Sequence, residues 1–306
     1  MRGLIAILAV LGGLLLVTST GAQAQNFFTR LFMSEPTHRS DRLFKTAHDG
    51  VAYDLAQRIE RGEAITAADV APFAEDINRR YGEDITLLFH AVASGNLSAV
   101  DAILGSGADM RQPDKSVGSS RDFIYYLGLP GGFTLDQDGI TEMIRLYLKH
   151  GGNPNVRSLG ERQQPLVSTV ALMQNIDGFF VLLEAGADPW AQTLKGGQPD
   201  GGSAMIMLAS EGTQYDTLNR LIDAGWFDEV NQTQLADFFS ALGGYAQRGD
   251  DRSLSIKQVA MRVLKRNPDY TPPPGSGGTA RIFKDHYDDP LPGAIPWDLI
   301  RSDAVQ

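Results

Sequence analysis

The stretch Ala91–Asp109, AVASGNLSAVDAILGSGAD, decides the fold. Small residues open it, and Gly95 follows them, as expected where a helix ends in a backbone conformation that favours glycine. Val100, Ile103 and Leu104 then recur at the spacing of one helical face. A second glycine follows this apolar face. The stretch therefore predicts two short helices joined by a tight turn.

The second half of this pattern recurs along the chain. Further copies lie at Ile144–Asn155, Phe179–Asp188 and Leu218–Gly225, and a weaker, earlier copy lies at Ala47–Gly62. One helical hairpin cannot bury its apolar face alone, so such units are stable only when several stack on each other. The sequence predicts an all-α fold, a solenoid of about five to six degenerate repeats.

Three short motifs carry a resemblance to a known family. Thr86–Ala91 resembles the T-P-L-H-x-A motif of the ankyrin repeat, with Leu in the Pro position and one extra residue before His. Gly107–Asp109 and Gly186–Asp188 keep the Gly-Ala-Asp ending. The resemblance extends over Leu43–Asn267. It implies an ankyrin-type helical-hairpin solenoid that binds proteins and does not catalyse a reaction.

Inserted loops lengthen the repeats beyond the ankyrin period of about 33 residues. Thr66–Arg79 is expected to form an additional helix with Ala67, Val70, Phe73 and Ile77 on one face. Asp114–Asp138 is rich in glycine and serine, and Lys195–Gly202 is expected to be a flexible loop. Insertions in repeat proteins usually emerge on one face, which is often the binding face.

The last repeat differs from the others. Leu235–Leu242 is predicted as its inner helix, and Ile256–Lys265 as its outer helix, whose basic side suits a terminal cap facing water. Pro272–Gly278 then interrupts regular structure. The expected domain boundaries are a signal peptide at 1–24, a repeat solenoid at 25–271, and a linker with an irregular C-terminal tail at 272–306.

The N-terminus has the features of a secretory signal peptide. Arg2 supplies a positive charge, Leu4–Val17 is apolar, and Ala22–Ala24 gives a small-residue cleavage pattern. An uncleaved anchor is the alternative, but Gly12–Gly13 and the early polar stop argue against a membrane span. No stable membrane insertion is expected after cleavage. A cysteine-free exported chain is expected in the periplasm of a Gram-negative cell.

The composition excludes several classes of function. The chain has 306 residues and no cysteine, which excludes disulfides, thiol catalysis and cysteine-ligated metals. Its formal charge is −10, from 27 Lys and Arg against 37 Asp and Glu, which argues against nucleic-acid binding and favours a basic partner. No catalytic motif, cofactor or metal site is predicted, and one protein partner is expected.

Candidate metal ligands are better explained by structural roles. His48 and His90 occupy inner-helix positions, where histidines of the resembled family usually bind neighbouring turns. The acidic residues around His286 are expected to lie in a solvated loop. A weaker candidate for a cation site is the set of acidic residues near the glycine-rich insertion, namely Asp122, Asp136 and Asp138.

Six residues are predicted to contact the partner. Trp190 lies where the ankyrin pattern places the polar tip of a β-turn, here called a finger, that follows the outer helix. An exposed aromatic anchor for a partner is therefore expected there. The alternative is that the Trp190 ring packs on the Lys195–Gly202 loop. Met110, Arg111 and Asn155 occupy corresponding tips. The remaining two, Tyr125 and Tyr126, are expected on the concave side.

These observations predict a periplasmic protein-binding module. Similar exported ankyrin proteins suggest two roles: immunity against a toxin, such as a type VI secretion effector, and support of an exported stress enzyme, such as a catalase. The alternative is a hydrolytic or metal-dependent enzyme built on the insertions at 112–138 and 192–202. A structural envelope scaffold with many weak partners is a third possibility.

Overall fold

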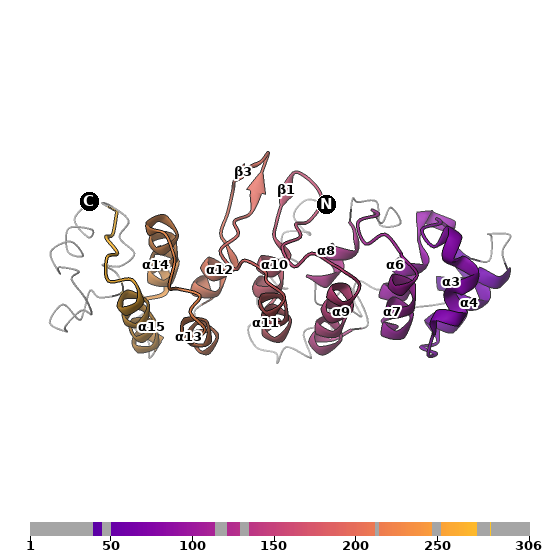
Figure 1. The fold of residues 1–306 in the computed structure, drawn as a ribbon, viewed down its shortest axis with the longest axis horizontal. Coiled ribbons are helices and arrows are strands. Elements are labelled where there is room, and N and C mark those ends of the chain that lie inside the picture. The colour runs from indigo at the N-terminus through magenta and orange to yellow at the C-terminus, as the bar shows by residue number, and fades with distance from the viewer. Residues whose placement is uncertain are drawn as a thin grey trace, which may run out of the picture. The chain divides into compact units, whose positions relative to one another are not determined.

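The computed structural model describes residues 39–44, 50–113, 121–128, 135–211, 214–246, 252–273 and 282. The expected signal peptide at 1–24, His48, and nearly all of the tail beyond 273 lie outside the described residues. The chain divides into two compact units, the first ending at Gly160 and the second beginning at Glu161. Each unit is a set of stacked helices (Figure 1). The predicted all-α fold of helical hairpins with inserted loops is confirmed.

The first unit holds the helices α3 to α9 and two short 3-10 helices. Their bounds are α3 Arg39–Leu43, α4 Gly50–Glu60, α5 Ala67–Val70, η1 Ala71–Asp76, η2 Gly82–Asp84, α6 Leu87–Ser94, α7 Leu97–Gly105, α8 Phe123–Leu127 and α9 Gln137–Lys149. Helix α3 packs on α4, α4 on α6, α5 on α7, and α7 on α9. The helices therefore form an inner row with α4 and α6 and an outer row with α5, α7 and α9.

The second unit repeats this arrangement with three hairpins. The helices are α10 Leu166–Leu172, α11 Ile176–Glu184, α12 Ala204–Ser210, α13 Tyr215–Asp223, α14 Gln232–Ala246 and α15 Arg252–Arg266. Inner helix α12 packs between α10 and α14, while α11 packs on α10, α13 on α12 and α15, and α15 on α14. The inner and outer helices predicted at Leu235–Leu242 and Ile256–Lys265 are confirmed as parts of α14 and α15.

The sequence sets the helix ends through caps and glycines. Thr86 accepts a hydrogen bond from the amide of Phe89 at 3.3 Å, and Asn96 accepts one from Ala99 at 3.0 Å, so both satisfy a free N–H at a helix start. Gly107 and Gly186 follow two outer helices with φ of 86° and 92°. Only glycine adopts this conformation at little cost, which confirms the predicted role of these residues.

The apolar face predicted on α7 is buried as expected. Val100, Ile103 and Leu104 are at most 5% exposed. His90 is fully buried in α6, and its Nε2 lies 2.9 Å from the carbonyl oxygen of Ala56. Because a carbonyl only accepts, Nε2 must carry the hydrogen in this contact. The structural role predicted for His90 is confirmed.

The expected additional helix at Thr66–Arg79 is the second helix of the first hairpin. It is short: α5 gives way to the 3-10 helix η1. Val70 and Ile77 are buried, whereas Ala67 is exposed and Phe73 half-buried, so the four residues expected on one face are not buried together. A 3-10 helix has fewer residues per turn than an α-helix, so residues spaced for one face of an α-helix do not all point to the same side.

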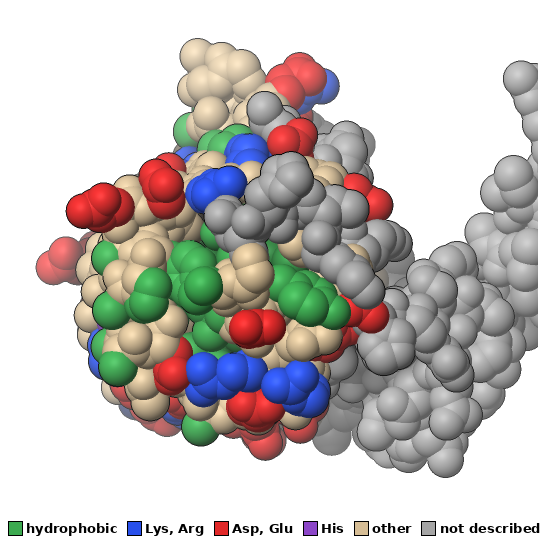
Figure 2. Space-filling model, turned by 90° about the vertical axis from the view of Figure 1, so that its right-hand side faces the viewer, with side chains coloured by type: hydrophobic (Ala, Val, Ile, Leu, Met, Phe, Trp, Pro, Cys, Tyr) green, Lys and Arg blue, Asp and Glu red, His purple; other side chains and the backbone are tan. Residues whose placement is uncertain are grey.

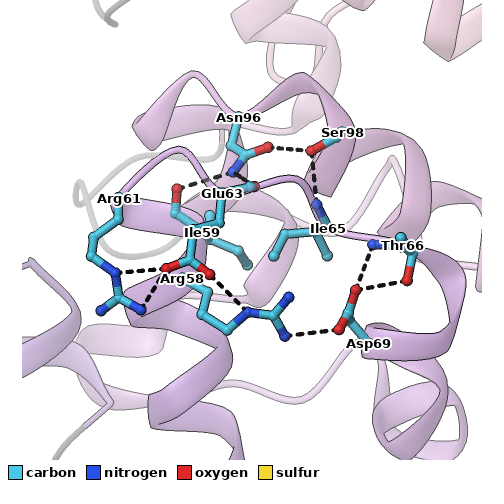
Figure 3. A network of polar contacts seen from close by, with 9 residues as sticks. All are labelled: Arg58, Ile59, Arg61, Glu63, Ile65, Thr66, Asp69, Asn96 and Ser98. Atoms are coloured by element: carbon cyan, nitrogen blue, oxygen red, sulfur yellow. Dashed lines mark hydrogen bonds and ion pairs between the residues drawn. The ribbon is translucent and has the colours of Figure 1, made fainter.

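A polar network fixes the turn between α4 and α5 (Figure 3). The Arg58 guanidinium lies 2.8 Å from Asp69 and 3.1 Å from Glu63. From the next hairpin, the Asn96 amide donates to the carbonyl oxygens of Ile59 and Glu63 at 3.1 and 2.8 Å. The first hairpin is thereby attached to the start of α7.

The end of the first unit next to α3 and α4 carries apolar side chains at the surface. Figure 2 shows several of them gathered above a row of basic side chains. Val51 on α4 belongs to this end and is 61% exposed. None of the described helices is long and apolar enough to cross a bilayer.

A three-stranded antiparallel sheet replaces the flexible loop expected at Lys195–Gly202. Its strands are β1 Arg162–Gln163, β2 Leu194–Lys195 and β3 Gln198–Pro199, in that order. The turn between β2 and β3 consists of Gly196 and Gly197, with φ of 56° and 81°. Positive φ at both central residues is typical of a two-residue hairpin turn that matches the strand twist. The insertion is therefore an ordered hairpin held by β1.

The basic side of α15 also differs from the expectation of a solvated cap. Arg266 lies 2.7 Å from Asp228, and Arg262 forms an ion pair with Asp223 at the end of α13. These contacts attach α15 to the preceding outer helix and its following turn. After α15, Tyr270 packs on Phe239 with ring centroids 5.0 Å apart and closes the core of the second unit.

Candidate functional site

Four of the six predicted partner-binding residues lie in or beside the start of α8. The carbonyl oxygen of Met110 accepts a hydrogen bond from the amide of Phe123 at 3.3 Å. The Arg111 guanidinium lies 2.8 Å from the carboxylate of Asp122 and donates to the carbonyl oxygen of Arg157 at 2.9 Å. Arg111 therefore connects the turn after α7 to α8 and to a later turn, and this occupies part of its hydrogen-bonding capacity.

Asp122, one of the three acidic residues considered for a cation site, caps α8. Its Oδ1 accepts a hydrogen bond from the amide of Tyr125 at 3.2 Å, and its side chain is 1% exposed. Burial raises the pKa of Asp122, although the nearby Arg111 acts in the opposite direction. Asp136 similarly caps α9 by accepting from the amide of Gly139 at 2.9 Å, and Asp138 is exposed in the first turn of that helix.

The two tyrosines predicted on the concave side differ in exposure. Tyr126 is 4% exposed and packs edge-on against Phe89 with ring centroids 5.7 Å apart, so it belongs to the core. Tyr125 is half-buried, and the guanidinium of Arg121 lies 4.5 Å from the centre of its ring. Asn155 is exposed, and its amide donates to Asn153 within their own turn. Of these three, Tyr125 and Asn155 reach the surface.

The expectation of an exposed aromatic anchor at Trp190 is wrong. The residue is 8% exposed, and its Nε1–H donates to the carbonyl oxygen of Trp226 at 3.0 Å. Its ring packs edge-on against Phe227, with centroids 5.5 Å apart, and against Phe238 at 6.3 Å. Trp190 is therefore a core residue that links two hairpins, and its ring finds these aromatic partners in place of the Lys195–Gly202 loop.

An open groove of about 500 Å³ lies in the second unit. One side is formed by the hairpin insertion and the segment leading into it, with Gln192, Pro199, Gly201 and Gly202. The other side is formed by the inner helices α12 and α14. We take this groove as the candidate functional site, because it combines an ordered projecting element with the accessible face of two helices.

The side chains that α14 contributes to the groove are small or polar, and α12 contributes one apolar side chain. Asp237, Ser240 and Ala241 lie at i, i+3 and i+4 on one face of α14, and Ile206 of α12 adds an apolar side chain. Asp237 and Ser240 are exposed, whereas Ala241 and Ile206 are half-buried. Among the described residues that line the groove, Asp237 is the single charged one.

Sequence reasoning located one wall of this groove and missed the other. The pattern of insertions predicts that Lys195–Gly202 lies on one face of the repeats, and this segment supplies most of the hairpin wall. Nothing in the local pattern of α14 marks Asp237 or Ser240, since they occupy the ordinary polar positions of an amphipathic helix. Their role depends on the hairpin that lies opposite, which a local sequence pattern does not place.

Within the described ranges, no group of three or more His, Asp or Glu side chains is arranged to hold a metal ion. The alternative enzyme hypothesis uses the insertion at 112–138, and residues 114–120 and 129–134 of this insertion lie outside the described ranges. The described lining of the groove presents the Asp237 carboxylate, the Ser240 hydroxyl and the Gln192 amide. This set suits hydrogen bonding to a polypeptide segment.

Comparisons with known proteins give a weak structural likeness. No protein-family model matches the chain, and no curated protein matches it. Among solved structures, the chain is similar to the ankyrin repeat domain of human ASB11, with 14% sequence identity and a TM-score of 0.40. That similarity covers 69% of this chain and 96% of the other.

Proposed function

We propose that this chain is a protein-binding module that holds a segment of one protein partner in the groove of its second unit. The observation that carries the proposal is the groove itself, which is bounded by an ordered hairpin and by α12 and α14. Ser240 and Ala241 are small, so a main chain can approach the α14 wall closely. The groove therefore fits an extended polypeptide better than a bulky globular surface.

The partner is expected to be basic. The chain carries a formal charge of −10, and Asp237 places a negative charge in the groove. Opposite charge steers a partner toward its site and raises the association rate, an effect that salt weakens. A basic partner of the intact protein should therefore bind more slowly at high ionic strength.

We also propose that Met110, Tyr125 and Asn155 of the first unit contact the partner. All three are half-buried or exposed, and Arg121 extends the surface beside Tyr125. Arg111 supports this region through its contact with Asp122. Tyr126 and Trp190 are excluded from the proposed contact because both are buried.

The proposed compartment is the periplasm, with the sequence cut after Ala24. This rests on the charged, apolar and small-residue segments of the first 24 positions. Mass spectrometry of the protein recovered from the periplasmic fraction of a Gram-negative host tests it. A mature chain beginning at Gln25 is expected, and an intact Met1 in the membrane fraction would show an anchor instead.

A groove-filling variant tests the binding function. In Ser240→Trp, a large side chain is placed on an exposed position of the groove wall, so the fold should persist while binding is lost. Gln258→Trp in α15 adds the same side chain at an exposed position of the outer row and serves as the matched control. Each variant is used to capture proteins from a periplasmic extract, and circular dichroism confirms that each one folds.

Wild type and Gln258→Trp are expected to retain the same single protein, and Ser240→Trp to lose it. Equal retention by wild type and both variants would contradict the groove as the binding site. Capture of many weakly held proteins would favour the hypothesis that the chain is a structural envelope scaffold. If the retained protein is a toxin, the purified chain should inhibit it, whereas a stress enzyme should gain thermal stability from the complex.

A further inference from the structure

The groove of the second unit presents an acidic side chain that could bind a positively charged group of the partner. Asp237 is exposed on the groove face of α14, and in the described part of the chain its carboxylate makes no hydrogen bond or ion pair. None of the lining residues that the structure describes is Lys, Arg or His, and the nearby Arg162 guanidinium, which lies beside Gly201, forms an ion pair with Asp200. A charge that faces a concave surface without a partner is available to an incoming cation.

The residues around Asp237 favour one kind of cation. Pro199 and Ile206 offer apolar contact, and Gly201 and Gly202 line the wall opposite Asp237 without side chains. Arginine fits such surroundings better than lysine does, because its guanidinium is flat, weakly hydrated and able to bind a carboxylate through two parallel hydrogen bonds. Its aliphatic stem packs on apolar side chains while the charged end reaches the carboxylate.

We propose that the groove recognises an arginine side chain of the partner, with Asp237 as the residue that binds the guanidinium. The inference rests on the proposed function, since it names the chemistry of the segment that occupies the same groove. The surrounding walls accept small or apolar neighbours of that arginine. A partner segment with an acidic residue at this position is disfavoured by repulsion from Asp237.

The probe is a blocked pentapeptide, acetyl-Gly-Leu-Arg-Leu-Gly-amide, compared with the same peptide in which citrulline replaces arginine. Citrulline has nearly the same shape as arginine and no charge, so the comparison isolates the charge. Binding is followed in the full mature chain by the amide NMR signals of Gly201, Gly202 and Ser240. The protein variants are Asp237→Asn and, as a matched loss of charge on the outer row, the exposed Asp177→Asn.

The arginine peptide is expected to bind saturably and about twofold to fivefold more tightly than the citrulline peptide, as for an exposed ion pair. This preference should disappear in Asp237→Asn and persist in Asp177→Asn. Equal affinity of the two peptides for wild type, or a preference retained in Asp237→Asn, would overturn the inference.

The peptide titration tests the arginine preference, and the capture experiment tests whether the groove binds a protein, so the two proposals can fail separately. No shift of the groove signals with either peptide would also overturn the arginine preference. The capture experiment with Ser240→Trp still decides separately whether the groove binds a protein. Loss of the captured partner in Ser240→Trp together with unchanged capture by Asp237→Asn would mean that the groove binds its partner without reading an arginine.

Discussion

The Arg111 guanidinium lies 2.8 Å from the carboxylate of Asp122, whose side chain is 1% exposed. One residue belongs to the turn that follows α7, and the other caps α8. The pair therefore links two successive hairpins of the first unit. Because the carboxylate is buried, the pair matters more for stability than an ion pair between two exposed side chains.

Replacement of Arg111 by alanine should destabilise the first unit. The change leaves a buried carboxylate without its cation, and removing one partner of a buried pair usually costs about 3–5 kcal/mol. The Arg111 side chain is 39% exposed, so water can take over part of its role. A smaller loss of about 1–3 kcal/mol in the free energy of unfolding is expected, measured by urea denaturation.

The double variant Arg111→Ala with Asp122→Asn provides the control. Asparagine keeps the side-chain oxygen that caps α8 and removes the charge, so the double variant should be more stable than Arg111→Ala alone. If the two variants unfold at the same urea concentration, the buried charge is not the cause of the instability.

The sequence predicted the helices well because the signals for them are local. Val100, Ile103 and Leu104 show the apolar face of α7, and Gly107 shows where that helix ends, all within one segment. The same pattern of an apolar face followed by a glycine recurs in α11, so two separate segments predict the same kind of helix. A prediction from local spacing needs no knowledge of what lies opposite the helix.

The surface predictions were less accurate because they depend on contacts distant in sequence. Trp190 occupies a finger position, but its ring reaches Phe227 and Phe238 of the following hairpins. The Lys195–Gly202 segment contains glycines that suggest mobility, but β2 pairs with β1 from the preceding finger. In both cases a non-local partner decides the outcome, and one sequence does not identify it.

Two adjacent glycines after α9 should respond differently to substitution. Gly151 has φ of 85°, and a Cβ there would meet nothing within 4 Å, so its constraint is the backbone conformation alone. Gly151→Ala is expected to cost about 1–2 kcal/mol, and Gly151→Asn less, because asparagine tolerates the left-handed region better. Thermal unfolding of the two variants gives the comparison.

Gly152 is constrained by packing instead. A Cβ at this position would lie 2.4 Å from ring carbons of Tyr147, whose hydroxyl donates to the carbonyl oxygen of Asn153 at 2.9 Å. Gly152→Ala should therefore displace a buried ring and cost about 1–3 kcal/mol. Gly152→Asn should be at least as damaging as Gly152→Ala. Rescue by asparagine at Gly152 would contradict the steric explanation.

Acid should weaken the contact between α7 and α9. The Asp101 carboxylate lies 2.8 Å from Lys149 and 2.7 Å from Nε2 of His150, and hydrogen bonds from these two side chains lower the pKa of Asp101. A carboxyl whose pKa is lower in the folded state stabilises the protein above its unfolded pKa. That contribution is lost as the pH falls through the lowered folded pKa.

The measurement is the melting temperature as a function of pH for wild type and Asp101→Asn. The Asp101 side chain is 38% exposed, so the stabilisation at neutral pH should stay below about 1 kcal/mol. The two curves should differ at neutral pH and converge in acid. A constant difference over the acid range would show that the charge of Asp101 is not responsible.

Trp190 should be essential for the stability of the second unit. Its ring lies edge-on to Phe227 and Phe238, and Phe227 lies edge-on to Phe238 with centroids 5.0 Å apart, so the three rings form one cluster. Trp190→Ala should leave a cavity in this cluster and cost about 3–5 kcal/mol in the free energy of unfolding. Trp190→Phe keeps most of the apolar volume but leaves the Trp226 carbonyl oxygen without its donor. A loss of about 1–2 kcal/mol is expected for that variant.

Trp226 supplies the matched control for these variants. It takes part in the hydrogen bond through its backbone carbonyl, and its side chain is half-buried, so Trp226→Phe preserves the bond. Urea denaturation followed by circular dichroism should rank the free energy of unfolding in the order Trp226→Phe, Trp190→Phe, Trp190→Ala, from most to least stable. If Trp190→Ala were as stable as Trp226→Phe, the Trp190 ring would contribute little to the stability of the core.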